Sequence, residues 1–147
     1  MTEDDDDKRL AFYNAELLKL SAEAEVPRHL AAPHLRARAI SPICGSEVEI
    51  ELTVEGEVVT DFGFEIEACA LTKTGVAVMA RAIRGKTRAE IAEAGRALEA
   101  MLNGENVFPA GDWAELKILE PVKDYKARHN SILLPFEAVE KAFKARK

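Results

Sequence analysis

Two cysteines, Cys44 and Cys69, are the residues of this 147-residue chain whose side chains most directly suggest chemistry. They are too few for the disulfide framework of a small secreted protein, so any function would use them as thiolates that bind metal or attack sulfur. Cys69 is predicted to precede a helix, where the positive end of the helix dipole favours the thiolate. The alternative is that both are small buried hydrophobic side chains.

A histidine near the C-terminal end, His129, is a third candidate ligand. Neutral imidazole commonly binds iron and zinc, and His129 would approach the cysteines if the last helix packs on the sheet. The alternative is a surface or capping histidine. His29 and His34 lie in a locally basic stretch, and we expect them to be solvated because no residue at ligand spacing flanks them.

The cysteines flank a predicted β-hairpin. Apolar residues alternate with glutamates over residues 47–54, and Glu55-Gly56 offers a tight turn. The chain returns over residues 58–67 with Val58, Phe62, Phe64 and Ile66 expected on the core side. In this antiparallel pair the glutamates are expected to face solvent, although carboxylates at period two also bind cations. Cys44 precedes the first strand and Cys69 ends the second, so both thiols should meet at the open end of the hairpin.

Helical signals surround this hairpin and indicate an α+β fold, a small antiparallel sheet of about three strands packed against several helices. The third strand is expected within Ala37 to Ile43, in a stretch otherwise predicted to be loop. Five helices are expected: one over Leu10 to Leu20, one between Cys69 and Gly85, one from the capping box Thr87-Arg88-Ala89-Glu90 to Leu102, one of about two turns from Asp112 to Pro121, and one over Leu134 to Ala145 with Pro135 in its first turn.

Composition excludes several classes of function. The formal net charge is −6, but residues 1–7 carry −5 of it, so the rest of the chain is near neutral and offers no footprint for nucleic acid. No apolar run reaches the roughly 20 residues that cross a bilayer, and the acidic start is unlike a signal peptide. We therefore expect a cytoplasmic protein with no membrane association. Nucleotide-binding and hydrolase motifs are also missing from the sequence.

The acidic start is expected to be separate from the folded part. We expect residues 1–9 to form a disordered acidic tail and residues 10–147 to form a single domain. Residues 4–8 (Asp-Asp-Asp-Asp-Lys) also match an enteropeptidase cleavage site, so a natural tail and a cloning remnant both remain open.

Three motifs together resemble the iron–sulfur cluster assembly scaffolds of the IscU/SufU/NifU N-terminal family. They are Pro42-Ile43-Cys44-Gly45 before the alternating strand, Ala68-Cys69-Ala70 before a helix that closes at Arg84-Gly85-Lys86-Thr87, and Arg128-His129-Asn130-Ser131-Ile132-Leu133-Leu134-Pro135. The resemblance extends over roughly residues 13–144. The segment 106–126 is more similar to the SufU branch, which has an insertion before the last helix.

The resemblance implies a ligand set. In the family, three cysteines and an aspartate hold a nascent cluster or a zinc ion. Cys44 and Cys69 match the first two cysteines, and His129 matches a histidine that precedes the third. The third cysteine is Asn130 here and the aspartate is Ser46, both weaker ligands.

The implied function is that of a scaffold or carrier, not an enzyme, which binds iron or a [2Fe-2S] cluster, or zinc. The implied partners are a cysteine desulfurase and recipient apoproteins, and a homodimer would supply four thiolates to one cluster. One alternative is a sulfur acceptor for a desulfurase, with or without zinc. Another is an interaction module that has lost metal binding.

Overall fold

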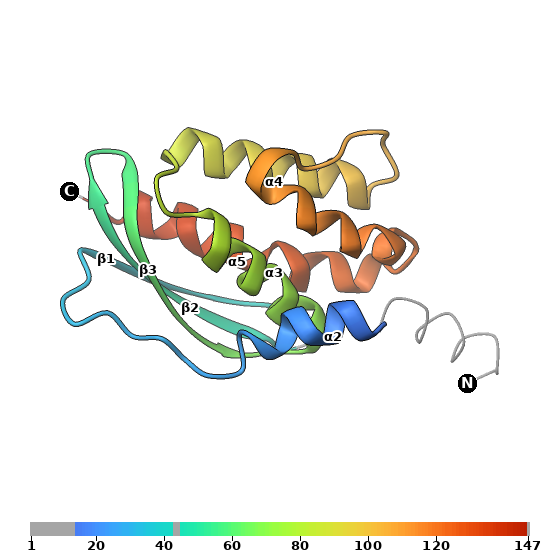
Figure 1. Cartoon of the computed structure of the whole chain (residues 1–147), viewed down its shortest axis with the longest axis horizontal. Helices are drawn as coiled ribbons and strands as arrows, with labels where there is room; N and C mark the ends of the chain where they lie inside the picture. The colour runs from blue at the N-terminus through green and yellow to red at the C-terminus, as the bar shows by residue number, and fades with distance from the viewer. Residues whose placement is uncertain (1–13, 43–44, 147) are drawn as a thin grey trace.

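A three-stranded antiparallel sheet forms one side of the molecule in the computed structural model, which describes residues 14–42 and 45–146 (Figure 1). The strands are β1 (Leu35–Ile40), β2 (Glu47–Glu55) and β3 (Val58–Glu67), and they lie in the order β1-β2-β3. This confirms the predicted α+β class and its three-stranded sheet. The first strand begins at Leu35 rather than Ala37, because its backbone pairs with β2 from Leu35↔Leu52 onward.

The helices gather on one face of this sheet (Figure 1). In chain order they are α2 (Ala15–Ala22), α3 (Ala70–Ala82), α4 (Arg88–Leu102), the 3₁₀ segment η1 (Gly111–Asp124) and α5 (Lys126–Lys144). Helix α5 packs on β1 and β2 and contacts α3, while α2 lies against α3. None of the helices in the described ranges combines the length and the continuous apolar character that a membrane span requires.

The hydrophobic core lies between the sheet and these helices. Val48, Ile50 and Leu52 of β2 are fully buried, as the period-two alternation predicts. Phe136 of α5 packs against the Trp113 ring, with 5.6 Å between the ring centroids. The predicted capping box at the start of α4 is confirmed, because the Thr87 hydroxyl accepts the Glu90 N–H and the Glu90 carboxylate accepts the Thr87 N–H.

Strand β3 departs from the predicted alternation near the hairpin turn. The register shifts between Thr53 and Val54, so that Val54 pairs with Val59 while Thr53 pairs with Asp61. This β-bulge turns Val59, instead of Val58, into the core, where it is fully buried. Sequence alternation has no signal for an inserted residue, so the core position at Val58 was predicted wrongly.

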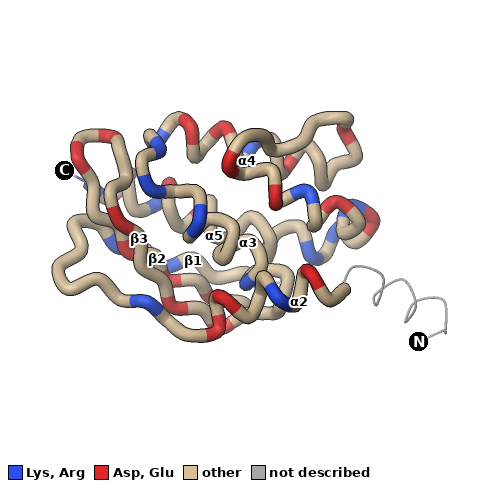
Figure 2. Tube along the Cα trace, in the orientation of Figure 1, with Lys and Arg blue, Asp and Glu red and all other residues tan. Residues whose placement is uncertain are grey.

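Acidic residues lie along β2 and β3 (Figure 2), but the expectation that all the hairpin glutamates face solvent is wrong for Glu51. The segment around Arg28 crosses this face and pairs with Phe64 through two backbone hydrogen bonds. Glu51 lies beneath the segment, with its side chain only 2% exposed, and accepts the Leu30 N–H at 2.8 Å. Gly63 permits the close approach, since a Cβ there would lie 2.7 Å from the Arg28 carbonyl oxygen.

Two helix predictions that rested on proline positions are wrong. Helix α5 begins at Lys126 and continues through Pro135, and η1 continues past Pro121 to Asp124. Pro135 is accommodated because the carbonyl that it leaves without a helical N–H donor, that of Ser131, accepts a hydrogen bond from another helix. Residues 10–13 of the helix predicted over Leu10 to Leu20 lie outside the described residues, and the described helix α2 runs from Ala15 to Ala22, two residues past the predicted end.

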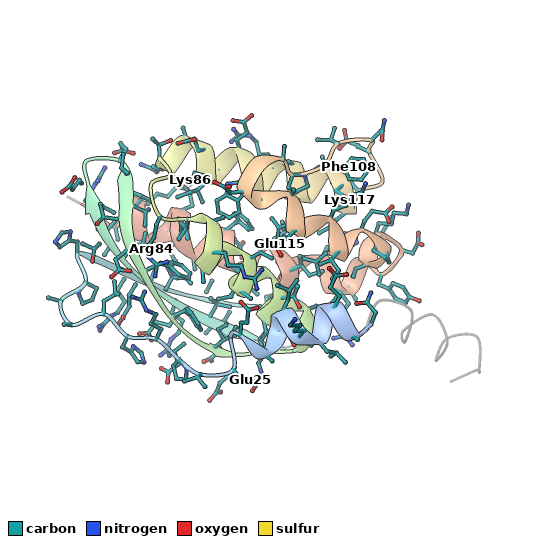
Figure 3. All side chains as sticks on the ribbon, viewed as in Figure 1. Glu25, Arg84, Lys86, Phe108, Glu115 and Lys117 are labelled. Atoms are coloured by element: carbon teal, nitrogen blue, oxygen red, sulfur yellow. The ribbon has the colours of Figure 1, made fainter. Side chains whose placement is uncertain are left out.

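Ion pairs surround the C-terminal end of α3, the helix that follows Cys69. Arg81 pairs with Glu23, the C-cap residue of α2, and with Glu115 of η1, the latter at 2.8 Å. Just after the helix, Arg84, which is labelled in Figure 3, pairs with Asp61 of β3 at 3.2 Å. These exposed contacts join the C-terminal end of α3 to three other parts of the structure.

Candidate metal centre

Cys69 occupies the junction between β3 and α3. It is the N-cap residue of α3, with extended backbone angles (φ −73°, ψ 169°), and its side chain is partly buried. Glu67, two residues earlier, pairs with Glu47 at the start of β2. Cys69 therefore lies at the open end of the hairpin, as the sequence predicted for it.

Cys44 lies outside the described residues, but the chain on both sides of it is described. The Ser41 N–H donates to the Ser46 carbonyl at 2.8 Å, and the Gly45 N–H donates to the Ser41 carbonyl at 3.0 Å. Gly45 has φ 75°, a conformation that glycine adopts without strain. Ser46, the weaker candidate ligand, is buried. These bonds anchor both ends of the Cys44 segment beside β2, at the sheet end where Cys69 lies.

A buried threonine connects Cys69 to α5. Thr72, in the first turn of α3, is fully buried, and its Oγ1 lies 3.7 Å from the Cys69 Sγ. The same hydroxyl donates to the Ser131 carbonyl of α5 at 3.1 Å. The first turn of α3 and the second turn of α5 are thus joined through one side chain, which brings Cys69 and the candidates His129 and Asn130 to neighbouring parts of the structure.

His129 lies inside α5 rather than before it, which corrects the sequence prediction, and its ring is oriented by η1. Its Nε2 lies 3.1 Å from the Val122 carbonyl and 3.1 Å from the Lys123 carbonyl. Both partners only accept, so Nε2 carries a hydrogen, and in the neutral ring that a metal requires Nδ1 keeps its lone pair. Metal-binding histidines commonly donate their other N–H to a backbone carbonyl in this way. The arrangement therefore suits a ligand that binds through Nδ1.

Asn130 presents a buried oxygen. Its Oδ1 is shielded from solvent and has no hydrogen-bond partner in the described part of the chain. An unpaired buried carbonyl costs about 1–3 kcal/mol, so such an atom marks a place where a donor or a cation would be favourable. The donors that α3 and α5 contribute are thus sulfur, imidazole nitrogen and amide oxygen, a set whose chemistry fits a transition-metal ion.

The described residues do not complete such a site. Within residues 14–42 and 45–146, no three His, Cys, Asp or Glu side chains are grouped so that they could hold a metal ion. One further candidate ligand, the thiol of Cys44, lies outside the described residues. A complete ligand set therefore depends on that thiol.

The other two histidines make contacts of their own. The His29 ring contacts Glu51, with 3.4 Å between Nδ1 and Oε2, and its side chain is half exposed. His34 Nδ1 accepts the Val54 N–H at 3.2 Å, near the hairpin turn and so at the far end of β2 from Ser46. Both residues are exposed, as expected, although each has a protein partner that the sequence did not indicate.

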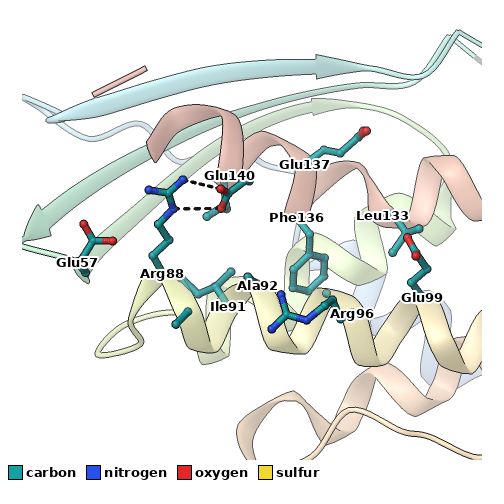
Figure 4. Close-up of a pocket in the computed structure, with 13 residues that line it drawn as sticks. Glu57, Arg88, Ile91, Ala92, Arg96, Glu99, Leu133, Phe136, Glu137 and Glu140 are labelled. Carbon is teal, nitrogen blue, oxygen red and sulfur yellow. Dashed lines mark hydrogen bonds and ion pairs between the residues drawn. The ribbon is translucent and has the colours of Figure 1, made fainter. Parts of the chain in front are cut away.

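A groove of about 610 Å³ lies between α4 and α5 (Figure 4). Phe136 and Leu133 contribute apolar surface, and the Arg88–Glu140 ion pair spans one end at 2.5 Å. The lining contains no cysteine or histidine among the described residues. This groove is therefore separate from the candidate metal centre.

Sequence reasoning missed the contact of Thr72 with Cys69 and its hydrogen bond to the Ser131 carbonyl. One signal was present: Thr72 is a polar residue three positions after Cys69, in the first turn of the helix that Cys69 begins. Its partner on α5 could not be read from sequence, because the contact joins residues 59 positions apart.

Comparisons with known proteins agree with this architecture. The profile of the "NifU-like N terminal domain" matches residues 25–132. The chain is 26% identical over 101 residues to "Zinc-dependent sulfurtransferase SufU" of Bacillus subtilis, covering 69% of each chain. It is 31% identical over 101 residues to "Iron-sulfur cluster assembly scaffold protein IscU" of Thermotoga maritima, covering 69% of this chain and 70% of the relative. The crystal structure of a nitrogen-fixing NifU-like protein (N-terminal) from Brucella abortus superposes with a TM-score of 0.84 at 40% identity, covering 90% and 92% of the two chains.

Proposed function

The chain belongs to the NifU-like N-terminal domain family of iron–sulfur cluster assembly scaffolds, and on that premise we propose that it receives iron and sulfide and passes the product to apoproteins. The cargo is a nascent [2Fe-2S] cluster or its iron. The observation that carries the proposal is the position of Cys69, partly buried at the start of α3 and joined through Thr72 to the helix that bears His129.

The ligands in this proposal are Cys44, Cys69 and Nδ1 of His129. The two carbonyls that fix the His129 ring support its role, because they leave Nδ1 free to bind. Asn130 Oδ1 and Ser46 are weaker donors, since a carbonyl oxygen is a hard ligand and a serine hydroxyl is normally protonated. The site on one chain is therefore expected to bind its cargo labilely.

A homodimer would compensate for the third cysteine that this chain lacks. Two cysteines from each protomer would give the four thiolates that hold a [2Fe-2S] cluster. Reconstituted protein would then elute as a dimer during anaerobic size-exclusion chromatography, and the cluster-free protein would not.

Anaerobic reconstitution with iron and sulfide tests the scaffold function. Wild type should develop visible absorption with stoichiometric iron and sulfide, Cys44→Ser and Cys69→Ser should remain colourless, and His129→Ala should lose its cluster faster. His34→Ala is the matched control, because that ring lies at the opposite end of β2. A wild type as colourless as the cysteine variants would refute the scaffold proposal.

A second function is favoured by the similarity to a relative named a zinc-dependent sulfurtransferase. In this alternative the chain binds zinc and accepts sulfur from a cysteine desulfurase. Stimulation of a desulfurase should then disappear in both cysteine variants. Equal stimulation by the double variant, with no metal bound by wild type, would instead indicate an interaction module without metal chemistry.

A further inference from the structure

The two edges of the sheet differ in how the rest of the chain covers them. Strand β3 forms one edge, and the Arg28 backbone pairs with it at Phe64 through N–H···O bonds of 2.9 and 2.7 Å. Nearer the hairpin turn, the Val59 N–H of β3 donates to the Lys86 carbonyl at 2.9 Å. Strand β1 forms the other edge, and no backbone segment in the described part of the chain makes a β-bridge to its outer side. The β1 edge is therefore open to another strand.

Alternate residues of β1 turn their backbone toward this open edge. The Ser41 N–H donates to the Ser46 carbonyl in line with the β1–β2 register, so hydrogen-bonded pairs recur at every second residue from there. Arg36, Arg38 and Ile40 occupy the positions between these pairs, where N–H and C=O groups point away from the neighbouring strand. These three residues carry the backbone donors and acceptors that an added strand would use.

The side chains at the same positions make the edge basic. The side chains of Arg36 and Arg38 are 59% and 58% exposed, and they pair with Glu51 and Glu49 of β2 at 2.9 and 3.0 Å. A guanidinium has more N–H donors than these bonds use. Carboxylates on a strand beyond β1 would lie directly opposite the two arginines, at the spacing where cross-strand charge pairs form.

The charge pattern argues against a second copy of this chain at the edge. Antiparallel pairing of β1 with another β1 would bring Arg36 and Arg38 against the same residues of the other copy, and like charges opposite each other are destabilising. In addition, Lys141 of α5 donates to the Arg38 carbonyl at 2.8 Å, so an incoming strand must displace its ammonium group. A carboxylate on that strand gives the displaced ammonium a new partner.

Space for the other face of an added strand lies between β1 and α5. A pocket of about 390 Å³ is lined there by Ala39, Ile40, Glu137, Glu140, Lys141 and Lys144. Side chains of a strand alternate between the two faces of the sheet, so those that do not face the arginines would point toward this pocket. The Ile40 side chain, 54% exposed, adds apolar contact area at the end of the strand.

We propose that the β1 edge is a docking site for an extended acidic segment of a partner protein, which adds to the sheet as a fourth strand. Backbone hydrogen bonds to Arg36, Arg38 and Ile40 give the affinity, and the two arginines select carboxylates at alternate positions. The proposal goes beyond the cargo function, because it requires no metal and no cysteine.

The experiment is a fluorescence-anisotropy titration of the full chain into a labelled peptide, Thr-Val-Glu-Val-Glu-Val-Thr, with blocked ends. A peptide with lysine in place of both glutamates should bind at least tenfold more weakly. A third peptide, N-methylated at both glutamates, keeps the charges but loses the N–H groups that face β1, and it should also lose binding. These two arms leave the protein unchanged.

Variants of the chain test the same contacts. Arg36→Gln and Arg38→Gln should each weaken binding of the glutamate peptide about two- to fivefold, as loss of a cross-strand charge pair does. Ile40→Pro removes one outward N–H without touching the bonds to β2, and it should weaken binding about tenfold. The matched control is Arg81→Gln, because Arg81 is a similarly exposed, ion-paired arginine on α3. Its affinity should equal that of wild type.

Several results would overturn the proposal. Equal binding of the glutamate and lysine peptides would exclude selection by the arginines, and so would equal affinities of Arg38→Gln and Arg81→Gln. Undiminished binding of the N-methylated peptide would show that it does not add as a strand. A wild-type dimer that Ile40→Pro converts to a monomer in size-exclusion chromatography would assign the edge to a second copy instead.

Discussion

Replacement of Glu51 by glutamine tests how the segment around Leu30 is held on the outer face of the sheet. Its carboxylate is 2% exposed and serves three donors: the Leu30 N–H at 2.8 Å, Arg36 at 2.9 Å and His29 at 3.4 Å. Glutamine has almost the same shape but only one acceptor oxygen. Its NH₂ group would oppose one of the donors that the carboxylate now accepts.

The loss of stability depends on which of the three donors can form hydrogen bonds to water once the carboxylate is replaced. The side chains of Arg36 and His29 are 59% and 49% exposed, so both regain solvent when the carboxylate is removed. The main loss is the charge-assisted bond from Leu30, together with a buried mismatch. Hydrogen bonds to charged groups contribute about 1.5–3 kcal/mol, so Glu51→Gln should lower the free energy of unfolding by about 2 kcal/mol.

Urea unfolding at neutral pH measures this difference. With a slope of about 2 kcal/mol per molar urea, the midpoint should fall by about 1 M. Glu65→Gln is the matched control, since its carboxylate is 53% exposed and lies 3.8 Å from His29. Its midpoint should remain near that of wild type, because surface ion pairs contribute little.

The pH dependence supplies a second readout. Burial alone would raise the pKa of Glu51, but the hydrogen bonds from Leu30, His29 and Arg36 outweigh it and hold the pKa below 4.5. A carboxyl with a lowered pKa stabilises the fold above its unfolded pKa, and this contribution is lost as pH falls through the folded pKa. The difference in free energy of unfolding between wild type and Glu51→Gln should therefore decrease below about pH 4.5. Equal shifts of the urea midpoint in Glu51→Gln and Glu65→Gln would refute this role of Glu51. So would a difference in free energy of unfolding between wild type and Glu51→Gln that increases in acid.

Three further predictions concern the framework of the fold. Gly63→Ala should lower the free energy of unfolding in urea by about 1–3 kcal/mol, because its Cβ would meet the Arg28 carbonyl at 2.7 Å; a neutral result would contradict that clash. Asp61 is held at a pKa of about 2, chiefly by hydrogen bonds from Arg28 and the Phe62 N–H. The contribution of this carboxylate to the free energy of unfolding is present above pH 3.8 and is lost as pH falls toward 2. Asp61→Asn should therefore make the free energy of unfolding depend less steeply on pH between 3.8 and 2. An unchanged slope would contradict this role of Asp61. Thr87→Ala should cost about 1 kcal/mol through loss of the α4 cap, seen as a lower Tm with α4 amides exchanging faster.

The sequence determined the elements whose signals are local. Period-two alternation set β2, because one face of a strand must be apolar to be buried, and Val48, Ile50 and Leu52 are all fully buried. The capping box at Thr87 fixed the start of α4, because its two hydrogen bonds form within four residues. The hairpin turn placed Cys69 at the open end of the sheet, since antiparallel pairing makes sequence distance from the turn equal to distance along the strand.

Tertiary structure decided how polar groups and prolines were accommodated. Glu51 follows the same alternation as its exposed neighbours, yet it is buried because the segment around Leu30 crosses the sheet and supplies an N–H. Pro135 reads as the first turn of a helix, yet α5 begins nine residues earlier because Thr72 satisfies the carbonyl that proline leaves without a donor. Local patterns encode what a segment buries, whereas the partner of each buried donor and acceptor comes from a distant segment, and that pairing exists only once the chain has folded.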